Sequence, residues 1–343
     1  MRHLLQSNPV RLFVLTLVHF SVDFSGGLLI PLLQPTLTNH LGVSIGVVTA
    51  STGAAALVVN LVQPVSGWLL PKRRMPGLLL VCPLLSGVVA LIGLSSLPAA
   101  FAGLLLISAV GTGLVHPEGA MTAHRVSVTH ESLGISVYMA GGYLGFSLGG
   151  MLSGVWVESF EPDLWGFQVF VVPAGLTAVL VLATGLHRLH GGPAETATEH
   201  ERGSGVSFAL VMPLCAAIAA NLCVLIRLYT VYLVRAFPAA DAAAQGWGGT
   251  TVGVLGLGGC TAAFIWGWLA ERFGPARLIA VMQLAAVPFL YQLLHVDHPS
   301  HAPWWGAGVA VTMGGVFPLS VVLARRARGP AQRLRLGLAV GGA

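Results

Sequence analysis

The chain has 343 residues, of which 55% are hydrophobic and only 8% are charged, whereas soluble domains carry about 25% charged residues. Together with a mean hydropathy of +0.82, this composition excludes a soluble domain and indicates a polytopic membrane protein. The net charge of +5 does not indicate nucleic-acid binding, because basic residues of membrane proteins collect in cytoplasmic loops.

Ten apolar stretches are long enough to cross a bilayer, which takes about 20 residues. The first begins like a signal peptide, but it continues past Asp23 without a small-residue cleavage site and therefore predicts a transmembrane helix. The predicted spans are 12–37, 44–69, 77–95, 98–123, 133–156, 165–187, 208–234, 247–270, 278–295 and 303–324.

The basic residues of the loops lie almost entirely on one side of these spans. If the N-terminus is cytoplasmic, the inner segments hold fifteen Lys and Arg residues, and the outer loops hold only Arg235. This asymmetry predicts a multi-pass membrane protein with its N-terminus in the cytoplasm. We expect the membrane to be the inner (plasma) membrane of a bacterial cell.

A polar stretch, residues 188–207, separates six spans from four and has the composition of a flexible cytoplasmic linker. We therefore expect an N-terminal six-helix bundle at 1–187 and a C-terminal bundle at 208–324. The sequence Gly-Trp-Leu at Gly67 recurs at Gly267, at the same position in each half. Related halves joined by a linker are typical of transporters.

The basic segment 325–343 predicts a cytoplasmic tail, although the first half leads us to expect two further spans there. Truncation or a frameshift after about Ala324 explains this pattern, and so does a genuine ten-span protein.

The loop that ends with Gly274 has the pattern Gly-x-x-x-acidic-Arg-x-Gly and includes Glu271 and Arg272. It resembles the loop motif of the major facilitator superfamily, whereas the copy at Gly67 departs from it because Pro71 replaces the acidic residue. Three further segments resemble the fosmidomycin-resistance branch of drug exporters within that superfamily. They are residues 19–35, 113–119 and 139–149.

This resemblance implies an all-α membrane fold of two helical bundles, with ten of twelve spans visible here. It implies a proton-coupled secondary transporter, an antiporter for drug efflux and antibiotic resistance, that exports a small drug-like or anionic molecule by alternating access. No cofactor is implied, and a monomer is expected, with a small molecule, protons and the bilayer as partners. An organic-anion or nutrient importer of the same superfamily is the alternative, as is a truncated inactive transporter or a membrane sensor.

Three predicted spans contain a strongly charged side chain, namely Asp23, Glu118 and Arg227. A charge at the centre of a membrane helix costs about 2.5–3.5 kcal/mol by insertion scales, so such residues usually face a cavity. In the superfamily, spans 1, 4, 7 and 10 line that cavity. His19 precedes Asp23 by four residues and shares its helical face. His116 lies close to Glu118 in sequence but on a different face.

We therefore expect Asp23 and Glu118 to handle protons with His19 and His116, and Arg227 to bind an anionic substrate or balance the acids. The alternatives without a role in transport are a structural His19–Asp23 pair, a position of Glu118 at a helix end, and an Arg227 side chain that extends to the outer surface. Further polar groups are predicted to contact the substrate: Asn60, Gln63, Tyr138 and Tyr143, and more weakly Asn221 and Tyr229.

The fifth span is rich in glycine, with Gly141, Gly145 and Gly149 at intervals of four residues. This spacing permits close helix approach, or it is an exporter motif associated with antiport. The four cysteines are scattered and lack metal-ligand spacing. Neither a nucleophile–base pair nor a metal-ligand cluster is apparent, so we expect no enzyme and no metal.

Overall fold

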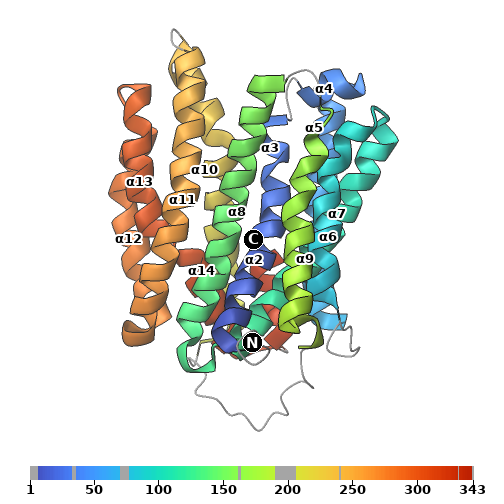
Figure 1. Cartoon of the computed structure of the whole chain (residues 1–343). Helices are drawn as coiled ribbons and strands as arrows, with labels where there is room; N and C mark the ends of the chain where they lie inside the picture. The colour runs from blue at the N-terminus through green and yellow to red at the C-terminus, as the bar shows by residue number, and fades with distance from the viewer. Residues whose placement is uncertain are drawn as a thin grey trace.

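The computed structural model describes residues 7–32, 36–69, 77–160, 164–189, 206–238, 241–330 and 332–341, which are almost entirely helical (Figure 1). Among these residues, nine helices are long and apolar enough to cross a membrane, and the helical segment Leu78–Leu94 is a shorter apolar one. The predicted all-α membrane fold is therefore confirmed.

The elements follow the predicted spans closely, with proline and glycine at many of their ends. Pro9 and Pro98 occupy first-turn positions, where a missing N–H costs nothing, and Gly185 ends a helix with φ +70°. Before the predicted linker the elements are α2 (Asn8–Gly27), α3 (Leu29–Leu32), α4 (Thr36–Leu41), α5 (Ile45–Leu69), α6 (Leu78–Gly87), η2 (Val88–Leu94), α7 (Pro98–Val126), η3 (Val128–His130), α8 (Glu131–Phe160), η4 (Phe167–Val171), α9 (Val172–Thr184) and η5 (Leu186–Arg188). After it they are α10 (Phe208–Ala236), α11 (Asp241–Phe273), α12 (Pro275–Leu294), η7 (Pro299–His301), α13 (Ala302–Met313), α14 (Val316–Arg326) and α15 (Gln332–Gly341).

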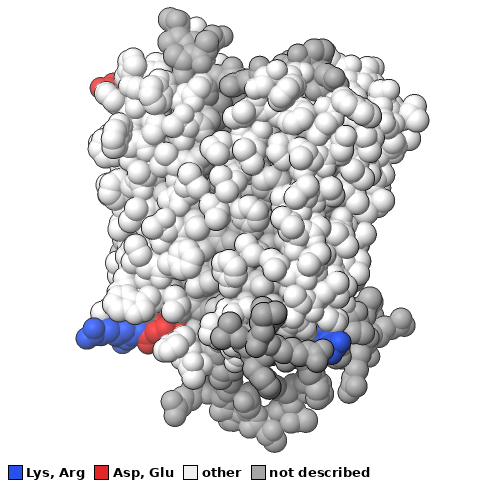
Figure 2. Space-filling view, viewed as in Figure 1, with Lys and Arg blue, Asp and Glu red and all other residues white. Residues whose placement is uncertain are grey.

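Figure 1 places α11, α12 and α13 on one side of the molecule and α5, α6, α7 and α9 on the other, with α2 and α8 between them. The most extensive contact between an element before the predicted linker and one after it is that of α8 with α11. The outer surface is apolar, with side chains such as Leu210, Leu284 and Trp304 more than 70% exposed. On the face shown in Figure 2, charged side chains of the described residues lie near the two ends and leave the middle band uncharged. This distribution suits a bilayer around the middle of the molecule.

The most extensive helix–helix contact among the described residues is that of α2 with α8, and the glycines of the fifth span make close approach possible. A Cβ atom at Gly141, Gly145 or Gly149 would lie 2.1–2.3 Å from a main-chain oxygen of α2. These three glycines, here called the glycine stripe, therefore serve the packing of α8 on α2, which was one of the two interpretations of their spacing.

The predicted span 303–324 lies within Pro299–Arg326, one of the nine described segments that are long and apolar enough to cross a membrane. Within it, Gly314 and Gly315 separate α13 from α14, and a Cβ at these glycines would meet Gly259 and Trp266 of α11. The segment predicted as a basic tail contains α15, whose Leu336 and Ala339 are buried. This helix packs against α5, where a Cβ at Gly337 would lie 2.5 Å from the carbonyl oxygen of Gln63. The buried apolar residues of α15 therefore help to hold it against the bundle.

Candidate functional site

Asp23 lies between two histidines from different helices. Its Oδ2 is 3.2 Å from Nε2 of His19, one turn earlier on α2, and its Oδ1 is 3.4 Å from Nε2 of His116 on α7. The side chains of His19 and His116 are only 1% and 11% exposed, whereas that of Asp23 is 24% exposed. The carboxylate therefore forms the accessible side of this buried group, here called the Asp23 trio.

Both imidazole rings are oriented by main-chain carbonyls. Nδ1 of His19 lies 2.8 Å from the oxygen of Tyr138 on α8, and Nδ1 of His116 lies 2.7 Å from the oxygen of Thr112, one turn earlier on α7. Because a carbonyl can only accept, each Nδ1 carries a hydrogen and donates it. Each Nε2 then faces Asp23 either as a lone pair or, in the imidazolium form, as a second donor.

Glycines provide the space that the trio occupies. A Cβ at Gly142 of α8 would lie 2.4 Å from Oδ2 of Asp23, and one at Gly119 of α7 would lie 2.1 Å from the hydroxyl of Tyr138. The Tyr138 ring stacks on His19 with centroids 4.3 Å apart. The contact between these rings fixes the position of His19 from the α8 side.

The hydroxyls of Tyr138 and Tyr143 are buried and have no hydrogen-bond partner within the described part of the chain. Both residues were predicted to contact substrate. Gln63 is buried as well, and its Oε1 likewise lacks a partner among the described residues. A buried polar atom without a partner is costly, and contact of these three groups with substrate stays a prediction.

The other predicted polar contacts lie elsewhere. Asn60 of α5 and Asn221 of α10 are exposed. The hydroxyl of Tyr229 donates to the carbonyl of Leu293 at 2.8 Å, so it already has a structural partner.

Glu118 is buried on α7, where it lines a small cavity with residues of α6 and η5 that include Leu79 and His187. The sequence placed Glu118 and His116 on different faces, and the structure agrees, since His116 contacts Asp23. The backbone of Arg227 belongs to α10, but its side chain lies outside the described residues.

The spacing of residues along the sequence shows no metal-ligand cluster, but among the described residues the fold brings together one group that could hold a metal ion. His19, Asp23 and His116 each offer a ligand atom, and these atoms lie within 4.8 Å of one another. The residue spacing hid the group, because only folding brings α7 beside α2.

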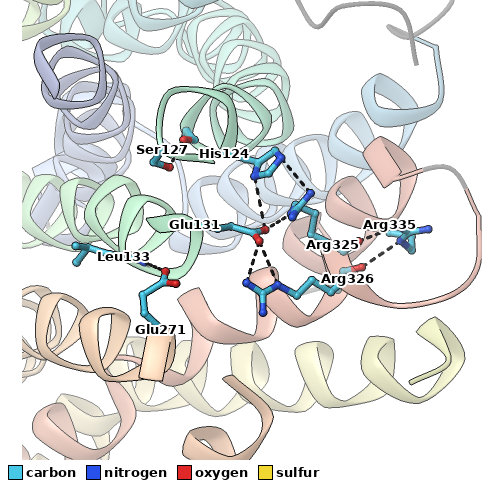
Figure 3. Close-up of polar contacts among 10 residues, drawn as sticks. His124, Ser127, Glu131, Leu133, Glu271, Arg325, Arg326 and Arg335 are labelled. Atoms are coloured by element: carbon cyan, nitrogen blue, oxygen red, sulfur yellow. Dashed lines mark hydrogen bonds and ion pairs between the residues drawn. The ribbon is translucent and has the colours of Figure 1, made fainter. Parts of the chain in front are cut away.

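A second polar cluster, which the sequence did not reveal, connects α7 and the start of α8 to α14 and α15 (Figure 3). Glu131, at the start of α8, accepts hydrogen bonds from Arg325 and Arg326 of α14 through different carboxylate oxygens, the latter at 3.0 and 3.1 Å. Arg325 also lies 3.1 Å from Nε2 of His124 on α7. Arg335 of α15 donates to the carbonyls of Ala324 and Arg325. We call these residues the Glu131 network.

The second copy of the loop motif lies beside this network. Glu271 accepts a hydrogen bond of 3.0 Å from the backbone N–H of Leu133, in the first turn of α8 (Figure 3). A Cβ at Gly267 would lie 2.5 Å from the Ser136 side chain, and Gly274 takes φ +83° between α11 and α12. Arg272 lies over the Phe273 ring at 5.7 Å. In the first copy, Gly67 is buried in α5, and residues 70–76 lie outside the described residues.

A family model of the Major Facilitator Superfamily matches residues 15–335. The chain belongs to the major facilitator superfamily. Its fold agrees with this assignment: a fucose transporter of the superfamily, solved in the outward conformation, superimposes with a TM-score of 0.63 at 14% identity over 98% of this chain and 88% of that chain.

Two curated members of the superfamily are similar in sequence. The fosmidomycin resistance protein of Escherichia coli K12 is 34% identical over 173 residues, which span 47% of this chain and 40% of that protein. An uncharacterized MFS-type transporter of Bacillus subtilis 168 is 24% identical over 333 residues, spanning 91% of this chain and 78% of that protein. The predicted resemblance to the fosmidomycin-resistance branch is confirmed.

Proposed function

We propose that this chain is a proton-coupled secondary transporter that exports a small drug-like or anionic molecule by alternating access. The observation that carries the proposal is the Asp23 trio: a carboxylate held between two imidazoles on two neighbouring helices of a superfamily fold. An ionisable group inside the membrane-spanning region is expected to serve an ion or substrate pathway.

The chemistry of the trio suits proton binding and release. The carbonyls of Tyr138 and Thr112 occupy both Nδ1 atoms, so each Nε2 is the position that gains or loses a proton beside Asp23. With both rings protonated the group carries one net positive charge, and with both neutral it carries one net negative charge. The trio can therefore favour an anion in one state and repel it in the other. Glu118 remains a predicted second proton site, and Arg227 a predicted substrate contact.

Alternating access also requires contacts that close one end of the transporter and open during transport. We infer this role for the Glu131 network and the Glu271 contact. They connect α7 and α8 to α14 and α11. By the predicted topology this end is cytoplasmic, and these contacts support our proposal of a state that is closed on that side. Alternation of access requires these contacts to break while the opposite end closes.

Export, rather than import, is proposed from the similarity to the fosmidomycin resistance protein. We would therefore measure fosmidomycin accumulation in bacterial cells that lack their own exporter and produce this chain. We expect lower accumulation than in empty cells, and loss of this difference when a protonophore collapses the gradient.

Asp23→Asn, made to an equal level in the membrane, should accumulate the drug as empty cells do. Extrusion that persists without a proton gradient would refute proton coupling, and raised accumulation in the producing cells would indicate import.

A further inference from the structure

The Asp23 trio has the composition of a metal site as well as that of a proton site. Two imidazole Nε2 atoms and a carboxylate lie within 4.8 Å of one another, with the N–O separations at 3.2 and 3.4 Å. Ligands about 2.0–2.2 Å from a tetrahedral Zn²⁺ ion are themselves roughly 3.3–3.5 Å apart. The separations from Oδ2 of Asp23 to His19 and from Oδ1 to His116 are close to that range, although each involves a different oxygen of the carboxylate.

The groups behind the ligands point to the same role. Histidines that bind metals characteristically donate their other ring N–H to a carbonyl or carboxylate, which fixes the tautomer and turns the free nitrogen toward the ion. His19 and His116 both do so, toward Tyr138 and Thr112. The Tyr138 ring, stacked on His19, and the T-shaped contact between the two imidazoles at 4.9 Å leave neither ring free to turn away.

The buried Glu131 network shows why histidine and carboxylate alone do not make such a site. His124 and Glu131 also lie near each other, at 3.7 Å. However, Arg325 and Arg326 already neutralise that carboxylate and would repel a second cation. Around Asp23, in the part of the chain that the structure describes, the ion-pair partners are two histidines, which can both serve as ligands.

We propose that His19, Asp23 and His116 bind one divalent transition-metal ion, of the class represented by Zn²⁺ and Co²⁺. Two imidazoles and one carboxylate are a ligand set that these ions accept. Three protein ligands leave at least one position open, and the partly exposed side of Asp23 is where that position would face. The inference rests on ligand identity and geometry, and it holds whichever way the transporter moves its substrate.

The test is Co²⁺ binding to the full-length protein in lipid nanodiscs, purified through a tag without histidine. Bound Co²⁺ is followed by its visible absorption, and Zn²⁺ is then added to displace it. We expect one Co²⁺ per chain, displaced by Zn²⁺, and at least about a tenfold loss of affinity in each of Asp23→Asn, His19→Asn and His116→Asn.

His295→Asn is the matched control, because this histidine lies at the exposed end of α12 and hydrogen-bonds only locally, to Tyr291. It should leave Co²⁺ affinity unchanged. Variants are compared only where size-exclusion profiles match the parent chain, and Zn²⁺-dependent thermal stabilisation provides a second measurement.

Equal affinity in the parent chain and the three trio variants would overturn the proposal, as would the absence of Co²⁺ absorption in the parent chain. Neither result requires transport, so failure of this inference is distinguishable from failure of the proposed function.

Discussion

Asp23 and His116 belong to different helices, yet Oδ1 of one lies 3.4 Å from Nε2 of the other. Glu118, two residues further along α7, faces the cavity beside α6 and η5 instead. We therefore predict that His116→Asn reduces proton-driven transport nearly as much as Asp23→Asn, by at least about tenfold, in the range expected for a lost proton-transfer group. Proton-gradient-driven uptake into inverted vesicles measures this directly.

Glu118→Gln is the comparison in that experiment. A smaller loss than in His116→Asn would place proton coupling at the Asp23 trio, whereas an equal or larger loss would make Glu118 the coupling residue.

Gly142 should tolerate no side chain. A Cβ there would lie 2.4 Å from Oδ2 of Asp23 and 2.7 Å from Cε1 of His19, so Gly142→Ala must displace the pair. We expect it to abolish most transport while the protein still reaches the membrane. Gly150→Ala on the same helix is the control, since its nearest neighbour would be 3.6 Å away. Transport that is equally low in both variants would mean that α8 tolerates alanine at neither position. Displacement of the trio would then not explain the loss of transport in Gly142→Ala.

Glu131 holds a buried arginine, since Arg325 is only 5% exposed. Removing one partner of a buried ion pair typically costs about 3–5 kcal/mol, because the other charge is left uncompensated. We predict that Glu131→Gln lowers the melting temperature in detergent markedly, and that adding Arg325→Met restores part of the loss. Glu271→Gln, which weakens one hydrogen bond to a backbone N–H, should cost only about 0.5–1.5 kcal/mol. Additive effects of Glu131→Gln and Arg325→Met would show that the two side chains are not coupled.

The contact of α15 with α5 depends on Gly337. A Cβ at this position would lie 2.5 Å from the carbonyl oxygen of Gln63 and 3.0 Å from Cα of Pro64. Because both are backbone atoms, Gly337→Ala should separate the helices and lower thermal stability. Gly175→Ala in α9 meets nothing within 4 Å and replaces a poor helix former, so it should be neutral or slightly stabilising. An unchanged melting temperature in Gly337→Ala would show that α15 does not contribute to the stability of the bundle.

Sequence reasoning reached the parts of this molecule that depend on local spacing. The pairing of His19 with Asp23 follows from their spacing of four residues, about one helical turn. The divergence of Glu118 from His116 follows from their spacing of two residues, which places them on different faces of the helix. The partnership of Asp23 with His116 did not follow, because it depends on how α7 packs on α2. The Glu131 network was missed for a related reason: Arg325 and Arg326 were counted among the residues of a polar tail. Only the packing of α14 against the start of α8 shows that Arg325 is buried.

Among the described residues, the groups that hold Asp23 come from α2, α7 and α8. They are the two histidines, the carbonyls of Tyr138 and Thr112, and the space left by Gly142. The glycine stripe locks α8 to α2 at three successive turns. If these helices tilt together, the contacts around Asp23 stay intact. What changes is which part of the molecule faces the exposed side of Asp23. The free energy barrier between the two access states would then reside in contacts such as Glu131 with Arg325. Substitutions at the network should therefore alter how fast the transporter cycles, whereas those at the trio should alter how many protons accompany each cycle.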